Sequence, residues 1–267
     1  MSSINRRDFL TGAGAILGAN AIAAPVRSLL STRDVPMLSP TASDYLQNGL
    51  VRLWDGIENV GAGLPHDPFA PAWIDHITGA TAMVQSDSYW DDFALCRDDK
   101  ANSAPNMAVI TTDRYSYDFW YFKTVEMVCD ISSARGFVFC DNSYRASTDV
   151  KWGQHCYVWT DRITHQMSLG HYSRKTAAIR YNTPVTYAFT QDIENGVYAT
   201  QDVFVNGADE DEGPYGDYWS AVAVSIGGTQ SDRAILGKIY ALRFYDRVLS
   251  QQELAYNFSI DQMRFGI

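Results

Sequence analysis

The segment 206–219 combines acidic and aromatic side chains in a loop rich in glycine and proline. It reads Asn-Gly-Ala-Asp-Glu-Asp-Glu-Gly-Pro-Tyr-Gly-Asp-Tyr-Trp, which places five carboxylates beside three aromatic rings. Carboxylate oxygens are ligands that Ca²⁺ prefers, and exposed Tyr and Trp rings pack against the apolar faces of sugars. We predict a loop that binds metal or glycan, the alternative being a solvated loop. The predicted Ca²⁺ ligands are Asp209, Asp211 and Asp217, and the predicted glycan contacts are Tyr215, Tyr218 and Trp219.

Two carboxylates on one predicted strand are candidates for hydrolytic chemistry. Glu126 and Asp130 are four residues apart, so both side chains point to one face of a strand, about 13 Å apart along the backbone. Glycosidases need carboxyl groups about 5 Å or about 6.5 to 9.5 Å apart, so this pair alone is too widely spaced. We expect these carboxylates to face cross-strand Lys or Arg, or water.

Other catalytic patterns are absent from the chain. The sequence contains no G-x-S-x-G elbow, no H-E-x-x-H pair and no G-x-x-x-x-G-K-[ST] loop. The five His are scattered; His165 and His171 approach each other only if their segment forms a hairpin, and a surface or core role is favoured for them. The residues therefore favour a protein that binds a ligand over one that transforms it.

The four cysteines leave two interpretations open. None belongs to a C-x-x-C pair, so a zinc site of the common spacing is not predicted. If the strands on either side of the segment 132–136 formed a hairpin, Cys129 would lie opposite Cys140, and a disulfide would be geometrically feasible. The alternative is that Cys96, Cys129, Cys140 and Cys156 are buried thiols that pack as small apolar side chains.

The elements that position these residues are predicted to be strands. Runs of β-branched and aromatic residues alternate with Gly, Pro, Asn and Asp from Tyr45 onward, and about a dozen strands at this spacing are typical of a two-sheet antiparallel sandwich. In Thr124 to Ile131 the odd-numbered positions are apolar, so Glu126 and Asp130 should lie on the face away from the core. The predicted strands are Leu50 to Trp54, Ala82 to Gln85, Met107 to Thr111, Thr124 to Ile131, Gly136 to Asp141, Cys156 to Trp159, Gln166 to His171, Thr176 to Tyr181, Val185 to Gln191, Gly196 to Val205, Ser220 to Ile226 and Gly237 to Tyr245.

A single short helix is predicted at the C-terminal end of the chain. Ser250 is a suitable N-cap and Glu253 the N3 residue of a capping box. Leu254 and Phe258 then form an apolar pair at i and i+4. We expect a helix from about Gln251 to Met263 that lies against the sandwich. Trp54, Trp73 and Trp90 are expected to be core residues.

The N-terminus has the order of an export signal. Arg6 and Arg7 precede Phe9 and Leu10, and a Gly/Ala-rich apolar run follows up to Ala24. This arrangement resembles a twin-arginine (Tat) signal peptide; a Sec signal or a membrane-tethered N-terminus is the alternative. We expect a signal peptide over 1–24, a flexible spacer over 25–44 and one domain over 45–267. The chain would then be periplasmic, secreted or attached to the cell surface.

Composition and charge limit the kinds of molecule that the chain is expected to bind. The chain has 267 residues, of which 46% are hydrophobic and 19% charged, as in globular proteins. Its formal net charge of −10 disfavours binding to a phosphate backbone, so no nucleic acid partner is expected. No run of 18 apolar residues occurs after residue 30, and we predict no membrane span in the mature chain.

The segment Gly237 to Leu254 reads G-K-I-Y-A-L-R-F-Y-D-R-V-L-S-Q-Q-E-L, and shorter motifs precede it at Leu53 to Gly56, Trp73 to Gly79, Thr124 to Glu126, Val203 to Gly207 and Ser225 to Gly228. In this order the segments resemble the LamG-like jelly-roll domain of the concanavalin A-like lectin/glucanase superfamily. Gly237 to Leu254 is similar to that family's closing motif, G-x-I-x-x-x-R-x-Y-[ND]-R-x-L-[ST]-x-x-E, and the shorter motifs are weaker matches. The resemblance spans about Leu50 to Phe265 and implies an all-β, two-sheet antiparallel jelly roll with a short C-terminal helix.

The resemblance says more about fold than about function. The superfamily contains sugar binders, glycan hydrolases, adhesion modules and proteins without a known ligand. Its glucanases use a strand motif E-x-D-x-x-E, which this chain lacks, and LamG-like relatives often hold Ca²⁺ near a rim of the sandwich. The expectation is an exported, non-catalytic glycan-binding or adhesion module whose partner is a carbohydrate. The alternatives are a divergent glycan hydrolase or lyase, and an assembly module without a small ligand.

Overall fold

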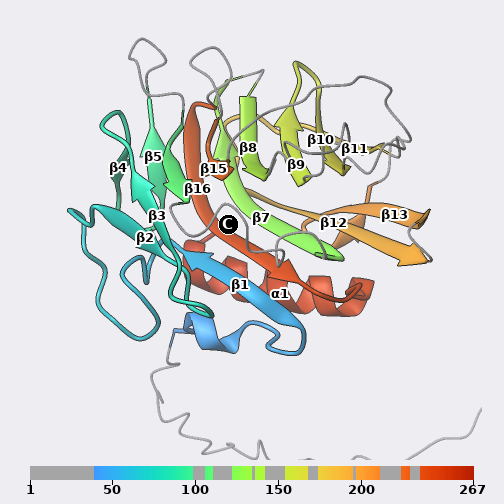
Figure 1. Cartoon of the computed structure of the whole chain (residues 1–267), viewed down its shortest axis with the longest axis horizontal. Coiled ribbons are helices and arrows are strands. Elements are labelled where there is room, and N and C mark those ends of the chain that lie inside the picture. Colours follow the sequence, from blue (N-terminus) through green and yellow to red (C-terminus); the bar gives the residue numbers. More distant parts are fainter. Residues whose placement is uncertain are drawn as a thin grey trace, which may run out of the picture. The chain divides into compact units, whose positions relative to one another are not determined.

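Two antiparallel β-sheets form the framework of the domain (Figure 1). The structure is a computed structural model, and it describes residues 39–98, 106–110, 122–133, 136–141, 154–167, 174–194, 197–210, 224–228 and 235–267. Every pair of neighbouring strands in these ranges is antiparallel. The all-β, two-sheet prediction is therefore confirmed.

Each sheet contains eight strands. In order, sheet A contains β14 (Ala208–Asp209), β13 (Val197–Val205), β12 (Val185–Glu194), β7 (Thr124–Ile131), β16 (Gly237–Tyr245), β5 (Leu95–Arg97) and β4 (Tyr89–Trp90), and β1 (Leu50–Asp55) also pairs with β16. Sheet B contains β11 (Arg174–Ala178), β10 (Arg162–Met167), β9 (Gln154–Val158), β8 (Gly136–Asp141), β15 (Val224–Ile226), β6 (Ala108–Ile110), β3 (Thr81–Val84) and β2 (Ala72–Ile74).

The main core lies between the sheets. Alternate residues of β7, from Val125 to Ile131, are buried in it together with residues of both sheets, as the period-2 pattern predicted. Trp54, Trp73 and Trp90 belong to the same core, so the expectation that they are core residues is confirmed. The Trp73 and Trp90 rings meet edge to face with centroids 5.3 Å apart, a favourable aromatic geometry.

Three long strands were predicted with the correct bounds, and four short strands were missed; β10 (Arg162–Met167) lies mostly before its predicted range of Gln166 to His171. Thr124–Ile131, Gly136–Asp141 and Gly237–Tyr245 have the bounds that the sequence predicted. The short strands β2, β4, β5 and β14 contain only two or three residues each and were not predicted. Such short strands are defined by their pairing with a neighbour, because two or three residues carry no measurable alternation.

The proposed hairpin between β7 and β8 is wrong, and so is the disulfide that depended on it. β7 pairs with β12 and β16 in sheet A, whereas β8 pairs with β9 and β15 in sheet B. The chain leaves sheet A after β7, where the Ser132 amide donates to the Leu236 carbonyl at 2.9 Å. Cys129 consequently points into the core as a free thiol. Cys96 and Cys156 are also buried free thiols, as the alternative interpretation predicted.

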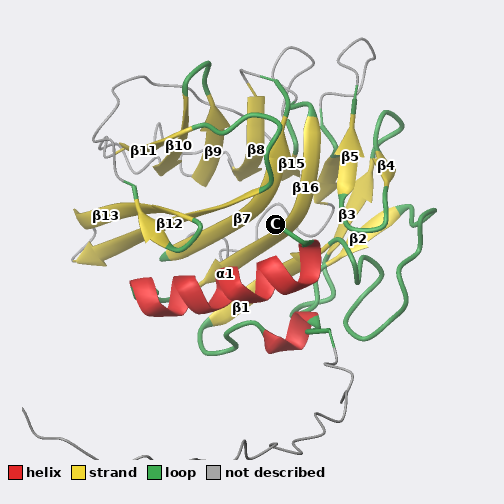
Figure 2. Ribbon diagram, turned by 180° about the vertical axis from the view of Figure 1, so that it is seen from behind, coloured by secondary structure: helices red, strands yellow, loops and turns green. Residues whose placement is uncertain are grey.

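Helix α1 (Gln251–Phe265) covers the face of sheet A that points away from sheet B (Figure 2). Leu254 and Ile260 pack there with Leu53, Ala188 and Phe204 of the sheet. The helix begins at the predicted capping box, in which the Glu253 carboxylate accepts from the Ser250 amide at 2.8 Å. It ends at Gly266, whose φ of 69° is left-handed and therefore suits glycine.

The stability of the fold should depend on pH through the Glu253 carboxylate at the start of this helix. The hydrogen bond from Arg247 lowers the pKa of Glu253 to about 2, from an ordinary value of 4.5. A lowered carboxyl pKa stabilises the fold above pH 4.5, and this stabilisation is lost as the pH falls toward 2. We expect thermal melts of Glu253→Gln and the unaltered chain to differ at pH 7 and to approach each other as the pH falls to about 2. A constant difference in melting temperature across this range would contradict the assignment.

The described part of the domain begins before Tyr45, the residue at which the sequence predicted it to start. A short 3-10 helix, Ala42–Asp44, precedes Tyr45, and both Ala42 and Tyr45 are buried in the cluster beneath α1. The Arg264 guanidinium donates to the Pro40 carbonyl at 2.8 Å. Residues 40–45 therefore pack on the same face of sheet A as the helix. Among the described helices, none is long and apolar enough to span a bilayer.

Candidate functional site

Glu126 belongs to a buried polar cluster between sheet A and α1, which we call the Arg243 cluster (Glu126, Arg243, Asn257, Asp261 and Tyr45). Arg243 Nε lies 2.9 Å from Glu126 Oε2, and its terminal nitrogens contact both oxygens of Asp261 at 2.6 and 2.8 Å. Asn257 Nδ2 donates to Glu126 at 2.7 Å, and Tyr45 Oη donates to Asp261 at 2.8 Å. The Arg243 guanidinium also lies 4.3 Å from the centroid of the Tyr45 ring, within the range of a cation–π contact.

This burial removes Glu126 from the list of catalytic candidates. The side chains of Glu126, Arg243 and Asp261 are fully inaccessible to solvent. Burial raises the pKa of Glu126, and the neighbouring Arg243 opposes that shift. A carboxylate with no access to solvent cannot meet a glycan, so Glu126 holds the helix on the sheet. Arg243 is the cross-strand neighbour of Glu126, which confirms the expectation that this carboxylate faces a cation.

Asp130 also lies opposite a cation. Its cross-strand neighbour is Lys238, and the Lys238 ammonium contacts Asp91 Oδ2 at 2.6 Å. Burial raises the pKa of Asp130, while the charge of Lys238 lowers it. Glu126 and Asp130 therefore occupy different environments on one face of β7, and the pair does not form a hydrolytic site.

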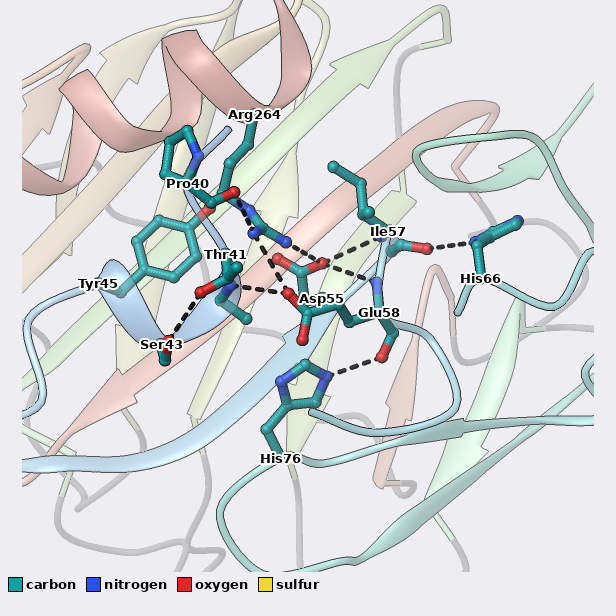
Figure 3. A network of polar contacts seen from close by, with 12 residues as sticks. Pro40, Thr41, Ser43, Tyr45, Asp55, Ile57, Glu58, His66, His76 and Arg264 are labelled. Carbon is teal, nitrogen blue, oxygen red and sulfur yellow. Dashed lines mark hydrogen bonds and ion pairs between the residues drawn. The ribbon is translucent and has the colours of Figure 1, made fainter. Parts of the chain in front are cut away.

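A second polar cluster joins the end of β1 to the C-terminal end of α1 (Figure 3). We call it the Asp55 cluster (Asp55, Glu58, Arg264, His66 and His76). Asp55 Oδ1 accepts from Arg264 at 2.7 Å, and Glu58 Oε1 lies 3.3 Å from the same guanidinium. Burial raises the pKa of Asp55 despite the nearby arginine. The arrangement anchors the segment after β1, because Asp55 also accepts the amide protons of residues 57 and 58 at 3.0 Å.

The two histidines of the Asp55 cluster have structural roles. His66 Nδ1 lies 2.9 Å from the Gly56 carbonyl, and His76 Nε2 lies 2.8 Å from the Glu58 carbonyl (Figure 3). A carbonyl oxygen can only accept, so each of these ring nitrogens carries a proton and donates it. The sequence predicted surface or core roles for His165 and His171. The side chain of His165 and all of His171 lie outside the described part, so this expectation stays a prediction.

The polar and aromatic group at the start of the acidic loop is the candidate site. We call it the loop-root cluster (Trp159, Asp161, Arg180, Tyr181 and Glu210). Arg180 forms an ion pair with Glu210, which connects the segment between β11 of sheet B and β12 of sheet A to the end of β14 in sheet A. Tyr181 Oη donates to the Trp159 carbonyl at 2.7 Å, and the Ile179 amide donates to the Asp161 carbonyl at 3.2 Å. Three chain segments that are far apart in sequence therefore meet at this end of the sandwich.

The side chains of the loop-root cluster are available to a ligand. Trp159 and Tyr181 are partly exposed, and the Arg180 and Glu210 side chains are 40% and 35% exposed. The Trp159 ring meets the Tyr157 ring at 4.8 Å, with Tyr157 largely buried beneath it. Partly exposed rings beside charged hydrogen-bonding groups can stack on a sugar and bond to its hydroxyls. The cluster can bind, and it contains no nucleophile paired with a general base.

The structure places only part of the acidic loop itself. Asp209 is exposed at the end of β14, opposite Phe204 of β13, and Glu210 follows in the loop-root cluster. Asp211, Tyr215, Asp217, Tyr218 and Trp219 lie outside the described residues. No group of three or more potential metal-ligating side chains occurs in the described ranges. The Ca²⁺ site that required Asp211 and Asp217 therefore stays a prediction.

Sequence reasoning missed the partners of the acidic loop. Arg180 and Trp159 belong to turns, and their proximity to Glu210 depends on how the two sheets stack. The signal in the sequence was the pair of turn-forming residues Asn182 and Pro184 after Arg180, and Asn182 does adopt a left-handed φ of 53°. Such residues indicate where a strand ends, but they do not identify the segment that lies beside the turn.

The fold defines a class: a two-sheet antiparallel β-sandwich in which a helix packs on the outer face of one sheet, with the candidate site at the ends of strands. No protein-family model and no curated protein sequence matches the chain. Among solved structures, it is similar to the sialidase of Trypanosoma rangeli in complex with 2,3-difluoro-KDN, with a TM-score of 0.51 and 16% identity. A mutant of that sialidase with trans-sialidase activity aligns with a TM-score of 0.51 and 17% identity.

These alignments establish the fold and no more. They cover 84% and 80% of this chain but 33% of each sialidase, so the chain spans about a third of their length. A carbohydrate-binding module, the CBM40 of Ruminococcus gnavus IT-sialidase, aligns over 51% of this chain and 82% of its own length, with 17% identity and a TM-score of 0.37. The sialidase alignments support the sandwich architecture. At 16% and 17% sequence identity they do not assign a function to this chain.

Proposed function

We propose that the chain is an exported, non-catalytic glycan-binding module of the LamG-like type, and that it contacts sugars at the loop-root cluster. The observation that carries the proposal is that partly exposed Trp159 bonds through its carbonyl to Tyr181, the residue next to the Arg180–Glu210 ion pair. This group lies where the acidic loop leaves β14. Tyr215, Tyr218 and Trp219 are proposed to extend the contact, and Asp209, Asp211 and Asp217 are proposed to bind Ca²⁺ and order the loop.

Three further features support a binding role. The domain has the same β-sandwich architecture as part of two structures of a sialidase, an enzyme whose name and bound sugar derivative indicate that it acts on glycans. Glu126, one of the two strand carboxylates considered for hydrolysis, is buried against Arg243. The N-terminal sequence resembles a twin-arginine signal, which supports export to a compartment where glycans are exposed. Together these features favour a glycan binder over a divergent hydrolase.

A glycan array with the full chain tests this function. We expect at least one glycan class to be retained in the presence of Ca²⁺, and EDTA to weaken that binding. Trp159→Ala should reduce the affinity about tenfold, because it removes a stacking surface and roughly 1.4 kcal/mol of binding free energy. Titration calorimetry with the retained glycan gives this ratio.

Tyr256→Ala is the matched control. Tyr256 is an aromatic residue with 49% exposure on α1, outside the loop-root cluster, so its replacement should leave the affinity unchanged. If no glycan is retained with Ca²⁺ or with EDTA, the proposed function is wrong. Release of new reducing ends from a retained glycan would instead identify a hydrolase.

A further inference from the structure

A group of exposed aromatic and acidic residues surrounds edge strand β4, away from the loop-root cluster. We call it the β4-edge surface (Phe69, Tyr89, Asp91, Asp92 and Phe93). Phe69 is 88% exposed, Tyr89 47% and Phe93 44%. Of the nine large hydrophobic residues exposed in the described part, six lie between Leu64 and Phe93. Three of these six, Phe69, Tyr89 and Phe93, lie in edge strand β4 or in segments next to it, and exposed apolar side chains that gather on one surface mark a binding site.

The turn that carries Phe69 is held rigidly. Buried Asn59 bonds to the backbone of Asp67 in both directions, at 2.8 and 3.0 Å. The Asp67 side chain then accepts the Phe69 amide proton at 2.8 Å, and Ala70 is buried. Pro65, Pro68 and Pro71 restrict the backbone on both sides. An aromatic ring presented from a rigid turn loses little entropy when it binds a ligand.

Strand β4 lies beside this turn. The indole nitrogen of buried Trp90 donates to the Ala70 carbonyl at 3.0 Å. After β4, Asp91 fixes the next turn, because its Oδ1 accepts the amide protons of Phe93 at 2.9 Å and of Ala94 at 2.7 Å. Tyr89 Oη donates to Asp98 at 2.6 Å. The three exposed rings are therefore attached to neighbouring, well-fixed segments, and Asp92 is exposed between them in the sequence.

The charge around this surface is negative. Of the seven Asp and Glu in residues 56–98, four form ion pairs: Glu58 with Arg264, Asp75 with Arg52, Asp87 with Arg97 and Asp91 with Lys238. The other three, Asp67, Asp92 and Asp98, leave the surface with a net negative charge. A surface of this charge repels anionic ligands and attracts cationic ones. It is therefore unsuited to acidic sugars and suited to neutral or amino sugars.

We propose that the β4-edge surface is a second glycan contact, which accepts neutral oligosaccharides and prefers cationic amino sugars. Sugars have apolar faces that stack on aromatic rings and hydroxyl and ammonium groups that donate to carboxylates. A protein partner is disfavoured because Asp and Glu are depleted from the cores of protein interfaces, whereas here they alternate with the aromatic residues. This inference rests on the proposed glycan-binding function and adds a second site with its own charge preference.

Titration calorimetry of the full chain with three hexasaccharides tests the inference. The probes are hexamers of glucosamine (cationic), N-acetylglucosamine (neutral) and galacturonic acid (anionic). We expect affinity to fall in that order at low salt. Phe69→Ala should weaken the first two between about twofold and about tenfold. Asp92→Asn should weaken only the glucosamine hexamer, and about 1 M NaCl should remove its advantage over the neutral hexamer, because the Debye length falls to about 3 Å.

Val248→Ala is the control, since Val248 is 40% exposed in the segment that precedes α1 and should change none of the affinities. Equal affinities for Phe69→Ala and the unaltered chain, a preference for galacturonic acid, or no binding of any hexamer would overturn the inference. If Trp159→Ala abolishes glycan binding and Phe69→Ala does not, the second site is wrong and the proposed function stands. Self-association that Phe69→Ala abolishes, seen by sedimentation, would make the surface a protein interface instead.

Discussion

Replacement of Arg243 by methionine should destabilise the domain by about 3–5 kcal/mol. Arg243 neutralises both Glu126 and Asp261, and all three side chains are inaccessible to solvent. Methionine keeps most of the volume but leaves two uncompensated carboxylates beneath α1. Urea unfolding followed by circular dichroism gives the free energy of unfolding.

Arg247→Met is the matched control for this variant. Arg247 also pairs with a carboxylate, Glu253 at 2.8 Å, but its side chain is 28% exposed. Exposed ion pairs contribute about 0.2–1 kcal/mol, so the control should lose far less stability. Equal losses in the two variants would show that burial does not determine how much the Arg243 cluster contributes to the free energy of unfolding.

The pH dependence of Arg243→Met separates charge from packing. Burial already holds the pKa of Glu126 above its ordinary 4.5 in the folded chain, and loss of Arg243 should raise it further. A carboxyl pKa raised by folding stabilises the fold at low pH, and this contribution is lost as the pH rises through the folded-state pKa. We therefore expect the variant to regain part of its stability between pH 7 and pH 5. A deficit independent of pH would indicate a packing defect.

Replacement of Gly237 by alanine should cost about 3 kcal/mol or more. Gly237 starts β16 with a φ of +125°, and it pairs with Ile131 on one side and Arg97 on the other. A Cβ atom there would lie 2.0 Å from the Asp130 carbonyl oxygen. Because the obstacle is backbone inside a sheet, the added methyl must displace a strand of sheet A.

Gly63→Ala isolates the backbone contribution in this experiment. Gly63 also has a left-handed φ, +72°, but a Cβ atom there would meet nothing within 4 Å. Its replacement should cost only the conformational penalty of about 1–2 kcal/mol. The difference between the two variants in urea unfolding measures the clash. If both lose the same stability, the strand tolerates the methyl group and the geometric argument fails.

The fold was largely predictable because its long strands carry their own pattern. β7 has an apolar residue at every odd-numbered position over its eight residues, and Ser250 with Glu253 identifies the start of α1. The exit from β7 was not predictable, since Ser132 and Ser133 are compatible with a turn but bond instead to Leu236. Which sheet β8 joins depends on contacts between residues about a hundred positions apart, and local sequence does not encode them.

The candidate site was less predictable than the fold. The acidic loop was recognisable by composition, whereas its contact with Arg180 depends on the stacking of β11 near β13. The sequence placed Glu126 on the face away from the core, which is correct, but it did not show that α1 covers that face. Asp261 had no recognisable signal, because a polar residue on a short amphipathic helix ordinarily points to solvent.

The Arg243 cluster also orders events during synthesis. Asn257, which donates to Glu126, lies 131 residues after it in the chain. At about 5–20 residues per second on the ribosome, Glu126 waits on the order of ten seconds for this partner. Until then Glu126 lacks this donor, and the apolar face of sheet A that includes Phe204 and Leu53 lacks the helix that packs on it. The domain is complete only after α1 has been synthesised, because the same helix supplies both the polar partners of Glu126 and the apolar cover of the sheet.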